Sequence, residues 1–140
     1  MYKRQIYYGV RSDFKISKNI NLSWKVECVL GNEGVDTVSD IDRLMFSDKS
    51  IALDLSGSAG TTAKILGAVF GKESVSNKSY VGIGLNFLDT GWTYDNLASV
   101  ALDAAGAKTN DQIVSLLWTN VIGTKPTAAD KQPFLSLIHI

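Results

Sequence analysis

The chain has 140 residues, with 14 basic and 14 acidic side chains, one histidine and one cysteine. The balanced charge provides no basic surface for nucleic acid or an anionic membrane, and a single cysteine excludes an internal disulfide. Apolar content is normal for a globular protein and no apolar run approaches the ~18 residues of a membrane span, so we expect a folded chain without a nucleic-acid partner or membrane insertion.

Both ends of the chain are predicted to be foreign to the native protein. One codon choice for residues 135–140, LSLIHI, is CTG TCT CTT ATA CAC ATC. The reverse complement of its first five codons encodes residues 1–5, MYKRQ, if GTG serves as the start codon. This DNA resembles a transposase-type sequencing adapter, so we interpret residues 6–134 as an internal fragment of a longer protein. The alternative is a native terminus and a chance match.

Removing these ends changes the chemistry of the chain. Without Lys3 and Arg4 the 14 basic residues fall to 12 against 14 acidic ones, a net charge of −2. The only histidine, His139, also lies in the excluded tail, which leaves residues 6–134 without an imidazole.

Residues 6–56 alternate with a period of two, which predicts β-strands. The first two alternating runs are joined by a turn at 19–21 and indicate a hairpin. Gly31–Gly34 breaks the pattern before two further runs, and the four runs cover 13–17, 23–30, 41–46 and 50–55. We expect a small antiparallel β unit of four or five strands. Cys28 is interpreted as a small buried apolar side chain of a strand, not a reactive thiol.

Residues 57–134 have helical periodicity and predict a bundle of four to five short helices, truncated at its C-terminus. The expected helix signals are a helix over 61–70 ended by Gly71, a cap at Ser76 or Asn77, a start at Thr93 with a stop at Gly106, a capping box at 109–112 with an end at Gly123, and a start at Pro126-Thr127. The fold class is therefore α+β.

The helical periodicity also predicts which side chains face inward. In the second helix we expect an inner stripe of Tyr80, Ile83, Gly84, Phe87 and Leu88. In the fourth we expect burial of Ile113, Leu116, Leu117 and Val121, with Trp118 as a further candidate. Gly82 and Gly84 lack the third glycine of a nucleotide-binding loop, and we expect them to allow a close approach between helices.

The segment 31–39, GNEGVDTVS, nearly fits the nine-residue G-G-x-G-x-D-x-U-x pattern of calcium-binding β-rolls. A calcium ion takes six to eight oxygen ligands, of which one copy of the pattern supplies about half. The candidate calcium site consists of Gly31, Glu33, Gly34 and Asp36. The interpretation that we favour is plainer: a tight glycine-rich turn in which Asp36 caps the backbone.

The chain is not expected to be an enzyme on its own. Without a native histidine, imidazole metal sites, Ser-His-Asp triads and Cys-His pairs are excluded from residues 6–134. Carboxylate pairs such as Asp40 with Asp42 have no spacing that marks an acid and a base, and we interpret them as solvated loop residues.

Two segments resemble known families. Residues 34–48, GVDTVSDIDRLMFSD, followed by Ala52-Leu53-Asp54, resemble a segment common in bacterial proteins of the repeats-in-toxin type. Residues 112–129, QIVSLLWTNVIGTKPTAA, resemble an uncharacterised family of short helices that often follows such segments. The chain departs from that family in having Thr124-Lys125 where an arginine-containing dipeptide is common. Together the resemblances cover most of residues 6–134.

The resemblance implies an extracellular or cell-surface parent protein exported by type I secretion. We expect a non-catalytic structural or interaction module that caps a calcium-binding β-roll, with other repeats of the parent chain or cell-surface components as partners. One alternative is an accessory domain of an extracellular hydrolase whose catalytic part is missing. Another is a glycan- or peptide-binding module that uses Trp92 and Tyr94 as an aromatic platform.

Overall fold

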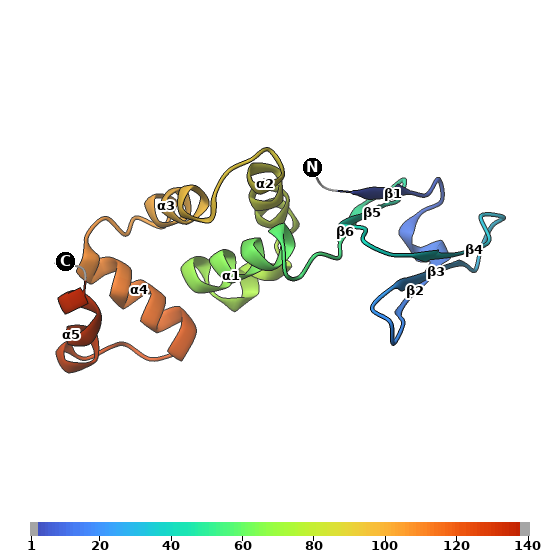
Figure 1. Cartoon of the computed structure of the whole chain (residues 1–140). Helices are drawn as coiled ribbons and strands as arrows, with labels where there is room; N and C mark the ends of the chain where they lie inside the picture. Colours follow the sequence, from blue (N-terminus) through green and yellow to red (C-terminus); the bar gives the residue numbers. More distant parts are fainter. Residues whose placement is uncertain (1–2, 138–140) are drawn as a thin grey trace. The chain divides into compact units, whose positions relative to one another are not determined.

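The structure is a computed structural model that describes residues 3–137, so His139 lies outside the described residues. The chain divides into two compact units, Met1–Leu55 and Ser56–Ile140. Among the described residues, six short strands form two three-stranded sheets in the first unit, and five α-helices lie in the second (Figure 1). The predicted α+β class is confirmed.

In the β unit, one sheet has the order β2-β3-β4 and the other β1-β5-β6. The strands are β1 (Arg4–Ile6), β2 (Phe14–Lys18), β3 (Trp24–Cys28), β4 (Val35–Val38), β5 (Arg43–Met45) and β6 (Ser50–Ala52). The predicted hairpin is the antiparallel pair of β2 and β3, in which Ile16 lies opposite Val26. The other two predicted runs form the antiparallel pair of β5 and β6.

The number of strands differs from the prediction in two places. β1 pairs in parallel with β5 and includes Arg4 and Gln5, which lie in the segment predicted to be foreign. The hydrogen bonds between paired strands join backbone atoms. β1 can therefore form whether Arg4 and Gln5 are native or foreign residues. β4 lies within the segment interpreted as a calcium loop. The expected strand from residue 41 begins only at Arg43, after Asp40 adopts a left-handed backbone with φ of 54°.

The core of the β unit is an aromatic cluster between the strands. Tyr7, Phe14 and Phe46 are buried, with ring centroids 5.0–5.3 Å apart. Leu44 and Val26 are almost completely buried beside them. Cys28 is partly buried against the same cluster, as a small strand side chain would be.

A buried ion pair joins β5 to the chain after β6. The guanidinium of Arg43 binds the carboxylate of Asp54, and their side chains are only 6% and 13% exposed. Nη1 of Arg43 also donates to the carbonyl oxygen of Asp42 at 2.9 Å. The pair therefore ties the end of the β unit to its central strand.

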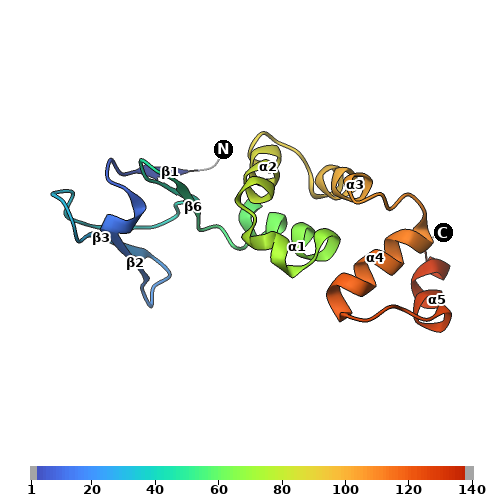
Figure 2. The same ribbon diagram turned by 180° about the vertical axis from the view of Figure 1, so that it is seen from behind.

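The helical unit consists of α1 (Ser58–Phe70), α2 (Lys78–Asp89), α3 (Tyr94–Ala104), α4 (Asn110–Ile122) and α5 (Ala128–Leu137). A short 3-10 helix, η2 (Lys72–Ser76), links α1 to α2. α1 contacts α2, α3 and α4, and α5 packs on α4, as both views show (Figures 1 and 2). None of the helices in residues 3–137 is long and apolar enough to cross a membrane.

The predicted helix ends are largely confirmed. The Asn77 side chain caps α2 by accepting from two backbone N–H groups. The capping box of Thr109 and Gln112 opens α4, and a second box of Thr93 and Asn96 opens α3. Gly123 ends α4 in a left-handed conformation with φ of 89°.

Parts of the predicted inner stripes are wrong. Val121 is 66% exposed, whereas Val114, two turns earlier on the same face of α4, is buried. Tyr80 and Ile83 are 44% and 54% exposed instead of fully inward. Periodicity gives the face of a helix, but which part of that face is covered depends on where the neighbouring helices end.

Asn120 connects α4 to the C-terminal end of α1. Its side-chain amide donates to the carbonyl oxygens of Ala68 and Val69 at 2.9 and 2.8 Å. These carbonyls belong to the last turn of α1, whose acceptors have no partner further along the helix. Asn120 therefore satisfies them and fixes the contact between the two helices.

Candidate functional site

The glycine-rich segment of the β unit forms a tight turn between β3 and β4. Gly31 and Gly34 have φ values of 143° and 76°, where a side chain would strain the backbone. A Cβ atom at Gly31 would also lie 3.1 Å from the sulfur of Cys28. Both glycines are thus required by the turn itself, as the favoured interpretation of this segment expects, but Asp36 lies in β4 and does not cap the turn as that interpretation also expects.

The carboxylate of Glu33, at the tip of this turn, is hydrogen-bonded to the backbone. Its two carboxylate oxygens accept from the N–H groups of Tyr8 and Gly9 at 3.1 and 2.8 Å. The glutamate therefore ties the turn to the segment after β1. Any cation at this position would compete with these two donors for the same oxygens.

Asp36 lies in β4, opposite Val26 of β3. It shares a face of the strand with Val38, which is buried, as the apolar position of the nine-residue pattern requires. Burial raises the pKa of the Tyr7 phenol well above its usual range, and the charge of nearby Asp36 adds to the rise. A close contact of the Tyr7 hydroxyl with the Asp36 carboxylate adds to this rise, although its geometry falls short of a full hydrogen bond.

The turn thus brings Glu33 and Asp36 to the same end of the β unit, together with Tyr7, which sequence reasoning missed. No spacing rule connects residue 7 to residue 36, so only the fold could place them together. Within residues 3–137, no three His, Cys, Asp or Glu side chains lie close enough to hold a metal ion by themselves. The carboxylates here would supply only part of a calcium shell.

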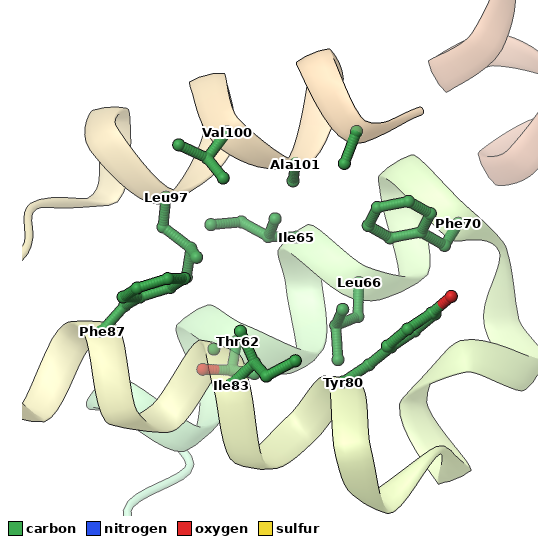
Figure 3. Close-up of a pocket in the computed structure, with 12 residues that line it drawn as sticks. Thr62, Ile65, Leu66, Phe70, Tyr80, Ile83, Phe87, Leu97, Val100 and Ala101 are labelled. Atoms are coloured by element: carbon green, nitrogen blue, oxygen red, sulfur yellow. The ribbon is translucent and has the colours of Figure 1, made fainter. Parts of the chain in front are cut away.

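The helical unit contains a separate apolar cavity of about 160 Å³ between α1, α2 and α3. Ile65 and Leu97 form its buried part, and Tyr80, Ile83 and Val100 form its half-exposed rim. In Figure 3 side chains from the three helices point toward one another around this space. The inner stripes of these helices meet here without filling it, because Gly84, Ala101 and Ala104 are small.

The proposed aromatic platform is partly used for packing. Trp92 stacks on Phe87, with ring centroids 4.2 Å apart and an interplanar angle of 19°. One face of its indole is therefore covered, and the side chain is 38% exposed. Tyr94 at the start of α3 is 57% exposed.

No protein family, no curated protein and no solved structure matches this chain.

Proposed function

We propose that the chain is a non-catalytic structural or interaction module of a secreted or cell-surface bacterial protein. In this proposal the β unit caps a β-roll formed by other, calcium-binding repeats of the same parent chain. The observation that supports it best is the position of β4, which carries Asp36 of the nine-residue segment and lies at the edge of its sheet.

An edge strand presents backbone groups to which a further strand can add. β4 pairs with β3 on one side only in the order β2-β3-β4. Val35 of this strand is 56% exposed, and Val29 and Leu30, just before the turn, are 52% and 70% exposed. An exposed apolar side chain on the edge strand itself, Val35, favours a neighbouring strand or repeat as the occupant, whereas Val29 and Leu30 lie on the β2 side of the sheet.

Asp36 is the residue that we assign to calcium. Glu33 is engaged by two backbone donors, whereas Asp36 has a partly buried carboxylate beside the turn. Stacked repeats share each ion between adjacent turns, so the remaining oxygens would come from the preceding repeat of the parent chain. Binding to the present chain alone is therefore expected to be weak.

Calcium is expected to stabilise the β unit in a concentration-dependent way. At about ten times its Kd, a ligand adds about 1.4 kcal/mol, which corresponds to a rise in Tm of roughly 10 °C for a unit of this size. The Kd is expected near the 10⁻⁴–10⁻³ M range of extracellular calcium modules. Thermal unfolding followed by the indole NMR signal of Trp24, the tryptophan of the β unit, measures this shift.

Asp36→Asn should abolish the calcium-induced rise, and Asp40→Asn is the matched control. Asp40 is a nearby exposed acid with a left-handed backbone that asparagine also adopts, so this variant should keep the rise. Magnesium at equal concentration should have little effect because its smaller ion demands a stricter octahedral shell. An equal rise in Asp36→Asn, or none in the unchanged chain, would refute the calcium assignment.

The two alternatives lead to different observations. An accessory domain of an extracellular hydrolase would be encoded in one reading frame with a catalytic domain upstream. A glycan- or peptide-binding module would depend on the exposed face of Trp92. Unchanged glycan binding in Trp92→Ala would remove that alternative, since the variant deletes the larger of the two platform rings.

A further inference from the structure

We propose that the cavity between α1, α2 and α3 binds a small, uncharged, apolar molecule of about the size of benzene. The inference concerns the helical unit and does not depend on the proposed role of the β unit. It rests on the size of the cavity, the chemistry of its wall and the limited exposed surface around its mouth.

The size of the cavity sets the size of the ligand. Its volume of about 160 Å³ is close to that of enclosed engineered apolar cavities, ~150 Å³, that bind benzene or xenon, although this cavity is open at its rim. Ile65 and Leu97 at its inner end are only 4% and 6% exposed. A ligand seated against them would be removed from water on that side and would face the half-exposed rim on the other.

The wall chemistry sets the class of ligand. The lining is aliphatic and aromatic, and none of the residues that form it carries a charge. Thr62 at the floor is 1% exposed, and its hydroxyl has no hydrogen-bond partner among the described residues. That hydroxyl lies against Gly84 of α2 and contributes no polar surface to the cavity. An ion or a carboxylate would lose its hydration here without compensation.

The surface around the mouth is too small for a protein partner. The exposed parts of Tyr80, Ile83 and Val100 amount to roughly 300 Å², less than half of the about 800 Å² per partner in a specific interface. Figure 3 shows these three side chains at the cavity, Tyr80 and Ile83 from α2 and Val100 from α3. The geometry therefore favours a small ligand over the side chain of a second copy.

Benzene is the probe for this site. Titrated into the full chain, it should shift the methyl NMR signals of Ile65 and Leu97 and raise the Tm of the helical unit with concentration. A Kd of about 1 mM is expected for a ligand of six non-hydrogen atoms. The signals of the β unit, such as the Trp24 indole, should not move.

Ala104→Leu should weaken benzene binding at least tenfold, because Ala104 lines the cavity yet is exposed enough to be enlarged without strain in the core. Ala129→Leu is the matched control, the same change at an exposed position of α5, and should leave binding unchanged. If Ala104→Leu does not fold, Val100→Phe at the rim provides the same test.

Three results would overturn the proposal. They are methyl signals that do not move up to the solubility limit of benzene, equal binding in the cavity variants and the parent chain, and a concentration-dependent dimer that Ala104→Leu abolishes. The last result, measured by sedimentation, would mean that a second copy occupies the cavity.

Discussion

Arg43→Met is expected to destabilise the β unit by about 3–5 kcal/mol, because it leaves the carboxylate of Asp54 buried without its cationic partner. The two side chains are 6% and 13% exposed, so water cannot replace the lost guanidinium. The donor to the carbonyl of Asp42 is lost as well. A unit of about 55 residues has a total stability of only about 3–8 kcal/mol, so a large fraction of the variant should be unfolded.

Chemical unfolding followed by the Trp24 indole signal measures this loss for the β unit alone, because Trp92 and Trp118 lie in the helical unit. Lys49→Met is the control. It removes a cation whose partner, Asp48, is 3.8 Å away at the surface, and the side chains are 47% and 40% exposed. Such a pair contributes about 0–1 kcal/mol. Equal effects of the two variants would contradict the assigned role of Arg43.

The double variant Arg43→Met with Asp54→Leu separates the charge from the packing. Replacing a buried ion pair with apolar side chains of similar volume is often neutral, whereas removing one partner is not. We therefore expect the double variant to recover most of the stability that Arg43→Met loses. A double variant as unstable as the single one would mean that Arg43 acts through contacts other than Asp54.

The fold was predictable where local chemistry determines it. The alternation around Ile16 and Val26 predicted the hairpin, and Thr109 with Gln112 predicted the start of α4, because strand period and helix capping are properties of adjacent residues. β1 was not predictable. A three-residue strand leaves no periodic signal, and its partner, β5, begins 39 residues later.

The candidate site was predictable only in part. The turn glycines could be recognised because left-handed backbone favours glycine, and Asp36 because its spacing from them fits a pattern. Tyr7 was missed, since its approach to Asp36 depends on how the two sheets fold together. The apolar cavity was missed for a related reason: periodicity identifies inward side chains but does not reveal whether Ala101 and Gly84 leave space between them.

Gly84→Ala is expected to destabilise the helical unit by about 1–3 kcal/mol, although alanine is the better helix former by about 1 kcal/mol. A Cβ atom at Gly84 would lie 2.6 Å from Cγ2 of Thr62, which is 1% exposed in α1. Thr62 is buried in α1, so its side chain has no room to move aside. The added methyl group would therefore force α1 and α2 apart. The sequence predicted this close approach correctly for Gly84, but not for Gly82, where an added Cβ would meet nothing within 4 Å.

Gly82→Ala is therefore the matched control, the same substitution two residues earlier in α2, and should raise stability by about 0.5–1 kcal/mol. Far-UV circular dichroism during chemical unfolding gives both values. Removing the Thr62 methyl and hydroxyl in Thr62→Ala should rescue Gly84→Ala, because the nearest remaining atom, Cβ of Thr62, would be 3.5 Å away. Additive effects of the two substitutions would show that Gly84 does not act through this contact. Opposite signs at 82 and 84, with rescue only at 84, would identify Gly84 as the point at which α1 and α2 meet.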